Sequence, residues 1–151
     1  TAAAADYLAE RGATFPELTA ETQDQLDDLL LGFTYDENPV DTGRPMPEFG
    51  EVIDTVARDD NVDIVLVYEL FEQALGYPLD ALDGLADSVD KPVLFAAEGI
   101  EEDMADDKAA LAAVDVPVFE TPERAADAAA VLARYGEMQA AGTDSEVVAD
   151  D

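Results

Sequence analysis

The stretch Val62-Asp63-Ile64-Val65-Leu66-Val67 decides the fold, because such a run of β-branched and apolar residues is typical of a strand covered on both faces. Strands of that kind occur mainly in parallel sheets. The segment 91–97 has the same character, and 116–119 is a shorter third candidate. We therefore predict three parallel strands, with the first ending at Val67.

Helical patterns alternate with these strands. Gly12 is placed to stop a first helix, Thr19 to cap a second, and Pro122 to begin the last. The expected helices cover about 2–11, 20–30, 47–58, 78–88, 101–113 and 122–138, and residues 32–46 are expected to be irregular. We predict one domain over 1–138, followed by an acidic linker or disordered tail over 139–151.

This alternation predicts the α/β class, specifically a three-layer, doubly wound parallel sheet of the flavodoxin-like type with helices on both faces. Domains of this type normally begin with a central strand whose loop leads into the first helix. Here the sequence opens on a helix. We therefore expect the first strand and its loop to be missing from this sequence or supplied elsewhere.

The charge is extreme: 7 Lys and Arg stand against 37 Asp and Glu among 151 residues, for a formal net charge of −30. Nucleic acid and anionic membrane surfaces would be repelled, so both are excluded as partners. One interpretation is a cation-binding or acidic decoy protein. The other is a cytoplasmic protein of an extreme halophile, in which molar salt screens the self-repulsion, and this is the interpretation that we favour.

The absence of two residue types limits the chemistry. The chain has no Cys and no His, which removes disulfides, thiolate sites, imidazole catalysis and most zinc chemistry. Serine hydrolase chemistry lacks both a nucleophile motif and a base. No apolar run is long enough to span a bilayer and no signal peptide is recognisable, so we expect a soluble chain in a high-salt cytoplasm.

Ligands of open α/β sheets bind outside the carboxyl ends of the strands. Three such places are indicated by the sequence: the start of the first helix at Thr1 and Ala2, the segment Tyr68, Glu69, Leu70 and Phe71, and the segment 97–99. The first is an anion site in principle and otherwise an ordinary terminus. The second is either a loop that lines a ligand or partner surface or a plain connection, and the third is interpreted as a simple turn.

Two further patterns carry weaker signals. Asn38, Pro39 and Asp41 form a turn signature, whose members hydrogen-bond local backbone or position a polar group. The acidic pairs 101–102 and 106–107 lack the glycine-centred loop of a calcium site, so a solvated helix face is the better interpretation. We predict no metal site in this domain.

Several segments together resemble a domain of the NDP-forming acyl-CoA synthetases. The nearest members are the ADP-forming acetate–CoA ligases of archaea, in the succinyl-CoA synthetase superfamily. The order and spacing of the matching segments agree along about 1–138. The segments are 4–12, 16–22, the Asn-Pro-Val-Asp motif 38–41, 60–67, 91–93, 116–125 and 132–135.

The resemblance implies a flavodoxin-like ligase domain of haloarchaeal type. The full enzyme would convert acyl-CoA, ADP and phosphate into acid, ATP and CoA through a phosphohistidine on another domain. CoA, ADP or ATP and Mg would be bound by the full enzyme, and no cofactor by this domain alone. The implied partners are the CoA-binding and ATP-grasp domains and a small-molecule acyl substrate.

The resemblance also assigns roles by position. The start of the first helix, Thr1 and Ala2, would lie on the phosphate side, although the family's Gly-rich loop is missing. Residues 68–71 would border the carboxylate substrate, but the Gly-Gly of that loop is absent. The alternative is a non-catalytic regulatory or interaction domain, as in acetyltransferase fusions.

Overall fold

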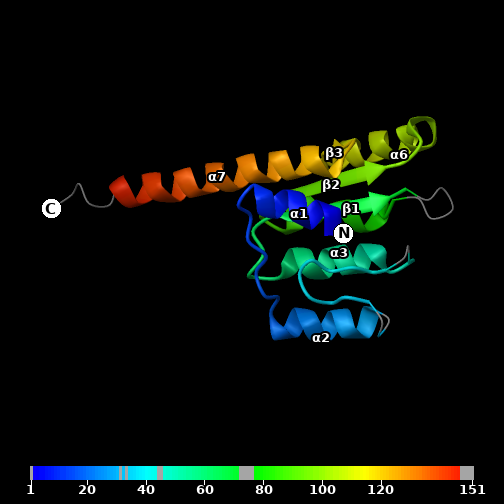
Figure 1. Ribbon diagram of the computed structural model, residues 1–151, viewed down its shortest axis with the longest axis horizontal. Coiled ribbons are helices and arrows are strands. Elements are labelled where there is room, and N and C mark those ends of the chain that lie inside the picture. Colours follow the sequence, from blue (N-terminus) through cyan, green and yellow to red (C-terminus); the bar gives the residue numbers. More distant parts are fainter. Residues whose placement is uncertain (1, 31, 33, 44–45, 72–76, 147–151) are drawn as a thin grey trace.

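A parallel sheet of three strands forms the centre of the molecule (Figure 1). The computed structural model describes residues 2–30, 32, 34–43, 46–71 and 77–146. The strands among them are β1 (Val65–Leu70), β2 (Val93–Glu98) and β3 (Val118–Phe119), in the order β1-β2-β3. Both pairings are parallel, which confirms the predicted sheet.

The first strand lies three residues further along the chain than predicted. Its register runs from Val65 opposite Val93 to Leu70 opposite Glu98, so Val62 and Ile64 precede the strand. The expected loop over 68–71 was therefore wrong for Tyr68, Glu69 and Leu70. The cause is β2, whose backbone ladder continues past the apolar run and holds these residues extended.

Four helices confirm the sequence pattern closely. They are α1 (Ala2–Glu10), α2 (Ala20–Leu29), α3 (Phe49–Arg58) and α6 (Glu101–Ala113). At the end of α1, Gly12 has a φ of +84° and the Ala13 N–H donates to the Leu8 carbonyl at 3.1 Å. At the start of α2, the Thr19 hydroxyl accepts from the Thr22 N–H at 3.3 Å.

Two helical predictions were wrong in detail. The expected helix 78–88 is two short helices, α4 (Leu79–Leu82) and α5 (Leu85–Ser88), because Gly84 takes a φ of +76° between them. The last helix, α7 (Pro122–Glu146), runs eight residues past its expected end at 138. Its many alanines favour helix and no proline follows Pro122, so the helix continues through residues 139–146.

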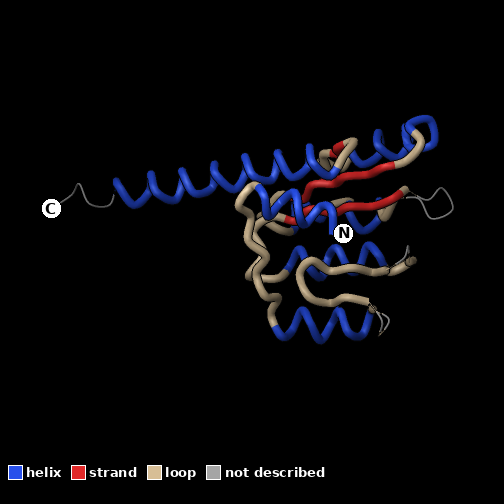
Figure 2. Tube along the Cα trace, in the orientation of Figure 1, coloured by secondary structure: helices blue, strands red, loops and turns tan. Residues whose placement is uncertain are grey.

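Helices cover both faces of the sheet (Figures 1 and 2). Odd-numbered residues of β1 and β2, such as Val67 and Phe95, join one apolar core with α3, α4 and α6. Even-numbered residues, such as Leu94 and Ala96, are buried outside that core, on the face where α1 and α7 pack. Helix α2 packs on α3 as an outer layer. This is the predicted flavodoxin-like arrangement.

Candidate functional site

The carboxyl edge of the sheet gathers the ends of several elements. Strand β1 ends there at Leu70 and β2 at Glu98, and α7 begins after β3. Helices α1 and α7 run side by side in the same direction, joined by an ion pair between Arg11 Nε and Asp127 Oδ1 at 2.5 Å. Both helices therefore direct their amino-terminal ends, which favour anions, toward this edge.

Two tyrosine–carboxylate pairs lie near this edge, on the face of the sheet that α1 and α7 cover. The Tyr68 hydroxyl on β1 donates to Glu98 Oε2 on β2. This hydrogen bond, with burial and the Glu98 charge, raises the pKa of Tyr68 to about 12. A hydrogen bond between Tyr7 and Glu123 likewise raises the pKa of Tyr7 and lowers the pKa of Glu123.

These pairs limit what the edge can bind. Glu98 and Glu123 accept hydrogen bonds as carboxylates, so they add negative charge close to the starts of α1 and α7. These carboxylates would repel a phosphate bound at the edge, so its binding would depend on the N–H groups at the starts of α1 and α7. The sequence did not reveal this cluster because Tyr7, Tyr68, Glu98 and Glu123 come from four separate elements.

The four residues predicted as a substrate-side loop do not form one surface. Tyr68 faces the α1 and α7 side, whereas Glu69 is buried. The Phe71 ring stands edge-on to Tyr77 with centroids 5.2 Å apart, within the core on the other face. Leu70 is 62% exposed at the strand end. The pleat of the strand divides the residues that a loop would have kept together.

The remaining edge residues fall into two groups. Ala2 is the first residue of α1, and Thr1 lies outside the described residues. Segment 97–99 ends β2 and turns toward α6, as predicted for a simple connection. Within the described ranges, no cluster of three or more acidic side chains has the spacing to hold a metal ion.

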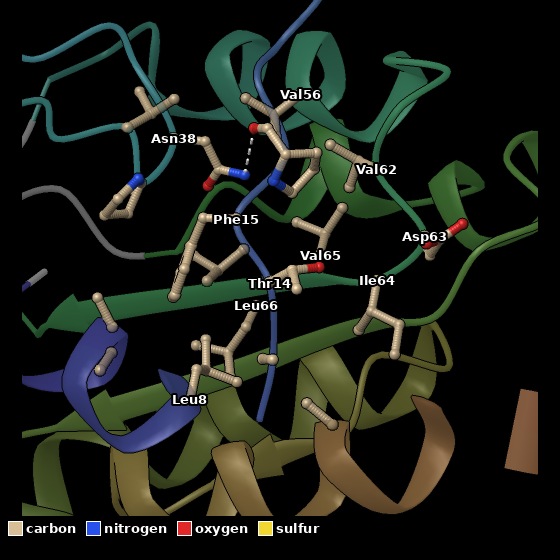
Figure 3. A pocket seen from close by; sticks show the side chains of 18 of the residues that line it. Leu8, Thr14, Phe15, Asn38, Val56, Val62, Asp63, Ile64, Val65 and Leu66 are labelled. Atoms are coloured by element: carbon tan, nitrogen blue, oxygen red, sulfur yellow. Dashed lines mark hydrogen bonds between the residues drawn. The ribbon is translucent and has the colours of Figure 1, made fainter. Parts of the chain in front are cut away.

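A cavity of about 530 Å³ runs along the edge of β1 that faces away from β2 (Figure 3). Helices α1 and α7 form its wall on one side and α3 on the other. Segment 13–16 lies across from β1 and closes the far side. The labelled side chains around it are mostly apolar: Leu8, Phe15, Val56, Val62, Ile64, Val65 and Leu66.

The motif Asn38, Pro39 and Asp41 is divided by the structure. Asn38 and Pro39 line the cavity, and Asn38 Nδ2 donates to the Pro16 carbonyl at 3.2 Å. Asp41 is outside the lining; its Oδ1 accepts from the Gly43 N–H at 2.8 Å, and its backbone pairs with Tyr35. Asp41 thus holds local backbone, as the turn signature predicts, whereas Asn38 bonds the backbone of a segment 22 residues earlier in the chain.

Asp59 is a buried carboxylate that the sequence did not single out. It accepts from the Thr19 N–H at 2.7 Å, the Thr19 hydroxyl at 3.0 Å and the Asn61 N–H at 2.8 Å. Burial alone would raise the pKa of Asp59, but hydrogen bonds from Thr22, Thr19 and Asn61 outweigh it and lower the pKa. Asp59 thereby ties the segment before α2 to the connection between α3 and β1.

Comparison with known proteins bears on the fold. No protein-family model matches the chain, and a search of curated proteins finds no match. Among solved structures, the chain is similar to PH0766 from Pyrococcus horikoshii OT3, with a TM-score of 0.73 and 25% sequence identity. The match covers 85% of this chain and 31% of PH0766, so the chain spans about a third of that protein's length. The likeness supports a flavodoxin-like fold of the CoA-ligase-like kind.

Proposed function

We propose that this chain is a domain of an ADP-forming acyl-CoA synthetase, which converts acyl-CoA, ADP and phosphate into acid, ATP and CoA. The phosphohistidine of that reaction would belong to another domain, because this chain has no His. CoA, the nucleotide and Mg would be held together with CoA-binding and ATP-grasp domains. The acyl substrate would be a small molecule.

The observation that carries the proposal is the agreement between the sequence resemblance and the fold. The segments that resemble acyl-CoA synthetases run in order along about 1–138. In the structure they form the framework of one parallel sheet and its edge, including α1, β1 and the start of α7. The likeness to PH0766 over 85% of the chain supports the same kind of fold.

The part assigned to this domain is electrostatic placement rather than proton transfer. The start of α1 would present backbone N–H groups to a phosphoryl group. Tyr68 would lie close to the acyl substrate, held by its hydrogen bond to Glu98. The negative charges of Glu98 and Glu123 would repel a second anion beside the phosphoryl group.

The reaction is tested with the complete polypeptide that carries this domain. With acetyl-CoA, ADP, Mg²⁺ and ³²P-labelled phosphate, we expect labelled ATP and an acid-labile phosphohistidine on a partner segment. The 151-residue chain alone should give neither product. Absence of both products from the complete protein, across short acyl-CoA substrates and both ADP and GDP, would refute the proposal.

A charge variant tests the role of α1. Ala3→Asp adds a negative charge in the first turn, which favours the helix but repels a phosphoryl group, so kcat/KM for phosphate should fall while the melting temperature holds. Ala20→Asp makes the same change at the first residue of α2 and is the matched control. Equal turnover in the two variants would remove α1 from the phosphate site.

A non-catalytic interaction domain is the second candidate, and the carboxylates near the edge favour it. Glu98 and Glu123 would resist a phosphoryl group but suit a partner with basic residues. The labelling experiment separates the two functions, because this candidate requires salt-sensitive partner binding without any phosphohistidine.

We also propose that the protein works in a high-salt cytoplasm. In the part of the chain that the structure describes, four ion pairs join an acidic to a basic side chain. The sequence carries 37 acidic residues, so the remaining negative charges repel one another. Molar salt shortens the screening length to about 3 Å and relieves this repulsion. The melting temperature should rise steeply from dilute buffer to molar KCl, and an unchanged value would contradict the proposal.

No helix among the described residues is long and apolar enough to cross a membrane.

A further inference from the structure

The carboxyl-terminal half of α7 carries an exposed apolar stripe. Val131, Tyr135 and Met138 are 65%, 60% and 73% exposed, and their spacing of four and three residues places them on one face of the helix. The opposite face packs toward the sheet, where Ala126 and Ala129 are buried. Figure 1 shows that this half of α7 extends beyond the sheet and the other helices. The stripe is therefore open to a partner.

The same stretch is nearly free of charge. Acidic residues make up 37 of the 151 residues, about one in four, yet residues 128–141 contain one acid, Glu137, and one base, Arg134. The net charge of the stretch is therefore zero, in a chain whose net charge is −30. Tyr, Met and Arg are enriched in protein interfaces, and Asp and Glu are depleted. The stripe thus has the composition of an interface rather than that of a solvated helix face.

This part of α7 gains little burial from the rest of the domain. Every residue from Ala133 to Ala141 is exposed in the structure. A helical segment of this length without a buried face depends on helix propensity alone, which makes it marginally stable in water. A partner packed on the stripe would supply burial that the described part of the domain does not.

We propose that the partner is a second copy of this chain, and that two α7 helices pair antiparallel through the stripe. In this arrangement Tyr135 lies opposite Tyr135 of the second copy, and Val131 lies opposite Met138. The same three side chains therefore fill both sides of a two-fold symmetric interface. Arg134 and Glu137 lie along one flank, where each is near the opposite charge of the second copy. Within the described part of the chain, Arg134 has no ion pair.

Charge favours the antiparallel orientation. Each copy carries a net charge of −30, and pairing through the projecting ends of α7 keeps the two acidic bodies at opposite ends of the contact. Parallel pairing would place the bodies side by side. At about 1.5 Å per residue, residues 128–141 give a contact about 20 Å long, which is small for a stable complex. We therefore expect a dissociation constant of micromolar order in molar salt. The pairing does not depend on the reaction proposed above.

Sedimentation equilibrium of the 151-residue chain in molar KCl measures the pairing. We expect a monomer–dimer equilibrium whose dissociation constant rises roughly tenfold or more in Tyr135→Asp, because the substitution places a carboxylate at the centre of the apolar contact. Ile100→Asp is the matched control, since Ile100 is also exposed, at 64%, but lies directly before α6. A wild-type chain that stays monomeric up to high micromolar concentration, or equal dissociation constants in the two variants, would overturn the proposal.

Cysteine cross-linking tests the orientation, because the chain contains no Cys. Under mild oxidation, Tyr135→Cys should form a disulfide-linked dimer, since the two substituted positions face each other across the symmetry axis. Val131→Cys and Met138→Cys should each stay largely unlinked alone and should cross-link when mixed. Ile100→Cys gives the rate of cross-linking by random collision. Self-linking of Val131→Cys and Met138→Cys as fast as that of Tyr135→Cys would indicate parallel pairing and would overturn the arrangement.

The complete polypeptide tests for a different occupant of the stripe. If two copies pair there, Tyr135→Cys should add the same cross-link to the complete polypeptide that it gives in the 151-residue chain, relative to the unsubstituted protein. If another domain of the polypeptide covers the stripe, Tyr135→Cys will add no cross-link there. That result would overturn the proposal.

Discussion

The two faces of the sheet are built from different residues, although they share the same strands. Phe95 and Ala96 are neighbours on β2 and both are fully buried. Phe95 points into a core of large side chains and stands edge-on to Tyr77, with ring centroids 5.1 Å apart. Ala96 points to the face covered by α1 and α7, whose buried residues apart from Pro122 are alanines: Ala4, Ala125, Ala126 and Ala129.

The difference divides two tasks between the faces. Large apolar side chains bury the most surface and carry most of the hydrophobic stabilisation. Alanines contribute little area, but they let α7 and α1 approach the strands closely. The α1 and α7 face also carries the Tyr68–Glu98 and Tyr7–Glu123 pairs. We therefore infer that the Phe95 face sets stability and the alanine face positions groups at the edge.

The largest expected effect is on the Phe95 face. Phe95→Ala removes a fully buried ring and its edge-on contact with Tyr77, which should cost about 3–5 kcal/mol of unfolding free energy. Urea unfolding in molar KCl measures the loss. Phe95→Leu keeps most of the volume and should cost less than half as much. Similar losses in the two variants would show that packing volume is not what Phe95 provides.

The second effect tests the buried carboxylate of Asp59, which ties the segment before α2 to the connection between α3 and β1. Asp59→Asn removes a charged acceptor from Thr19 and Asn61 and should cost about 2 kcal/mol at neutral pH. The fold lowers the pKa of Asp59, so its stabilisation is present above the unfolded value of about 3.9 and is lost as pH falls through the lower folded value. Unfolding at pH 7 and pH 3 should show the difference between wild type and variant shrinking.

Asp60→Asn is the control for Asp59→Asn. It removes the same charge from the adjacent residue, which is exposed. It should leave stability unchanged or slightly raised, because it lowers the net negative charge of the chain. A loss equal to that of Asp59→Asn would mean that charge, and not the hydrogen bonds, explains the result.

The third effect is on the alanine face. Ala126→Leu adds three carbons where α7 packs against the sheet side and should cost about 1–3 kcal/mol through overpacking. Ala133→Leu is the control further along the same helix, where the residue is exposed. If Ala126→Leu is tolerated as well as Ala133→Leu, the close approach of α7 is not set by the alanines.

The sequence predicted the layers of this fold better than its edge. Helix α6 was bounded correctly because the signals that begin and end a helix lie in the local sequence. Strand β1 was misplaced because Tyr68 and Glu69 are polar, and only pairing with β2 keeps them extended. The Tyr68–Glu98 contact depends on the register between two strands, which no single segment encodes. For the same reason, the sequence did not show which helices cover which face of the sheet.

The smallest expected effect concerns Tyr68 on the alanine face and appears only in alkali. The hydrogen bond to Glu98 raises the pKa of Tyr68 to about 12, above the unfolded value of about 10. Its stabilisation is therefore complete below pH 10 and is lost as pH rises toward 12. Tyr68→Phe should cost about 1 kcal/mol at pH 8 and progressively less above pH 10, measured by urea unfolding in molar KCl. Tyr135→Phe, at an exposed position on α7, should match wild type throughout. If the cost of Tyr68→Phe stays constant to pH 12, the hydroxyl does not contribute through Glu98, and the alanine face holds this pair by packing alone.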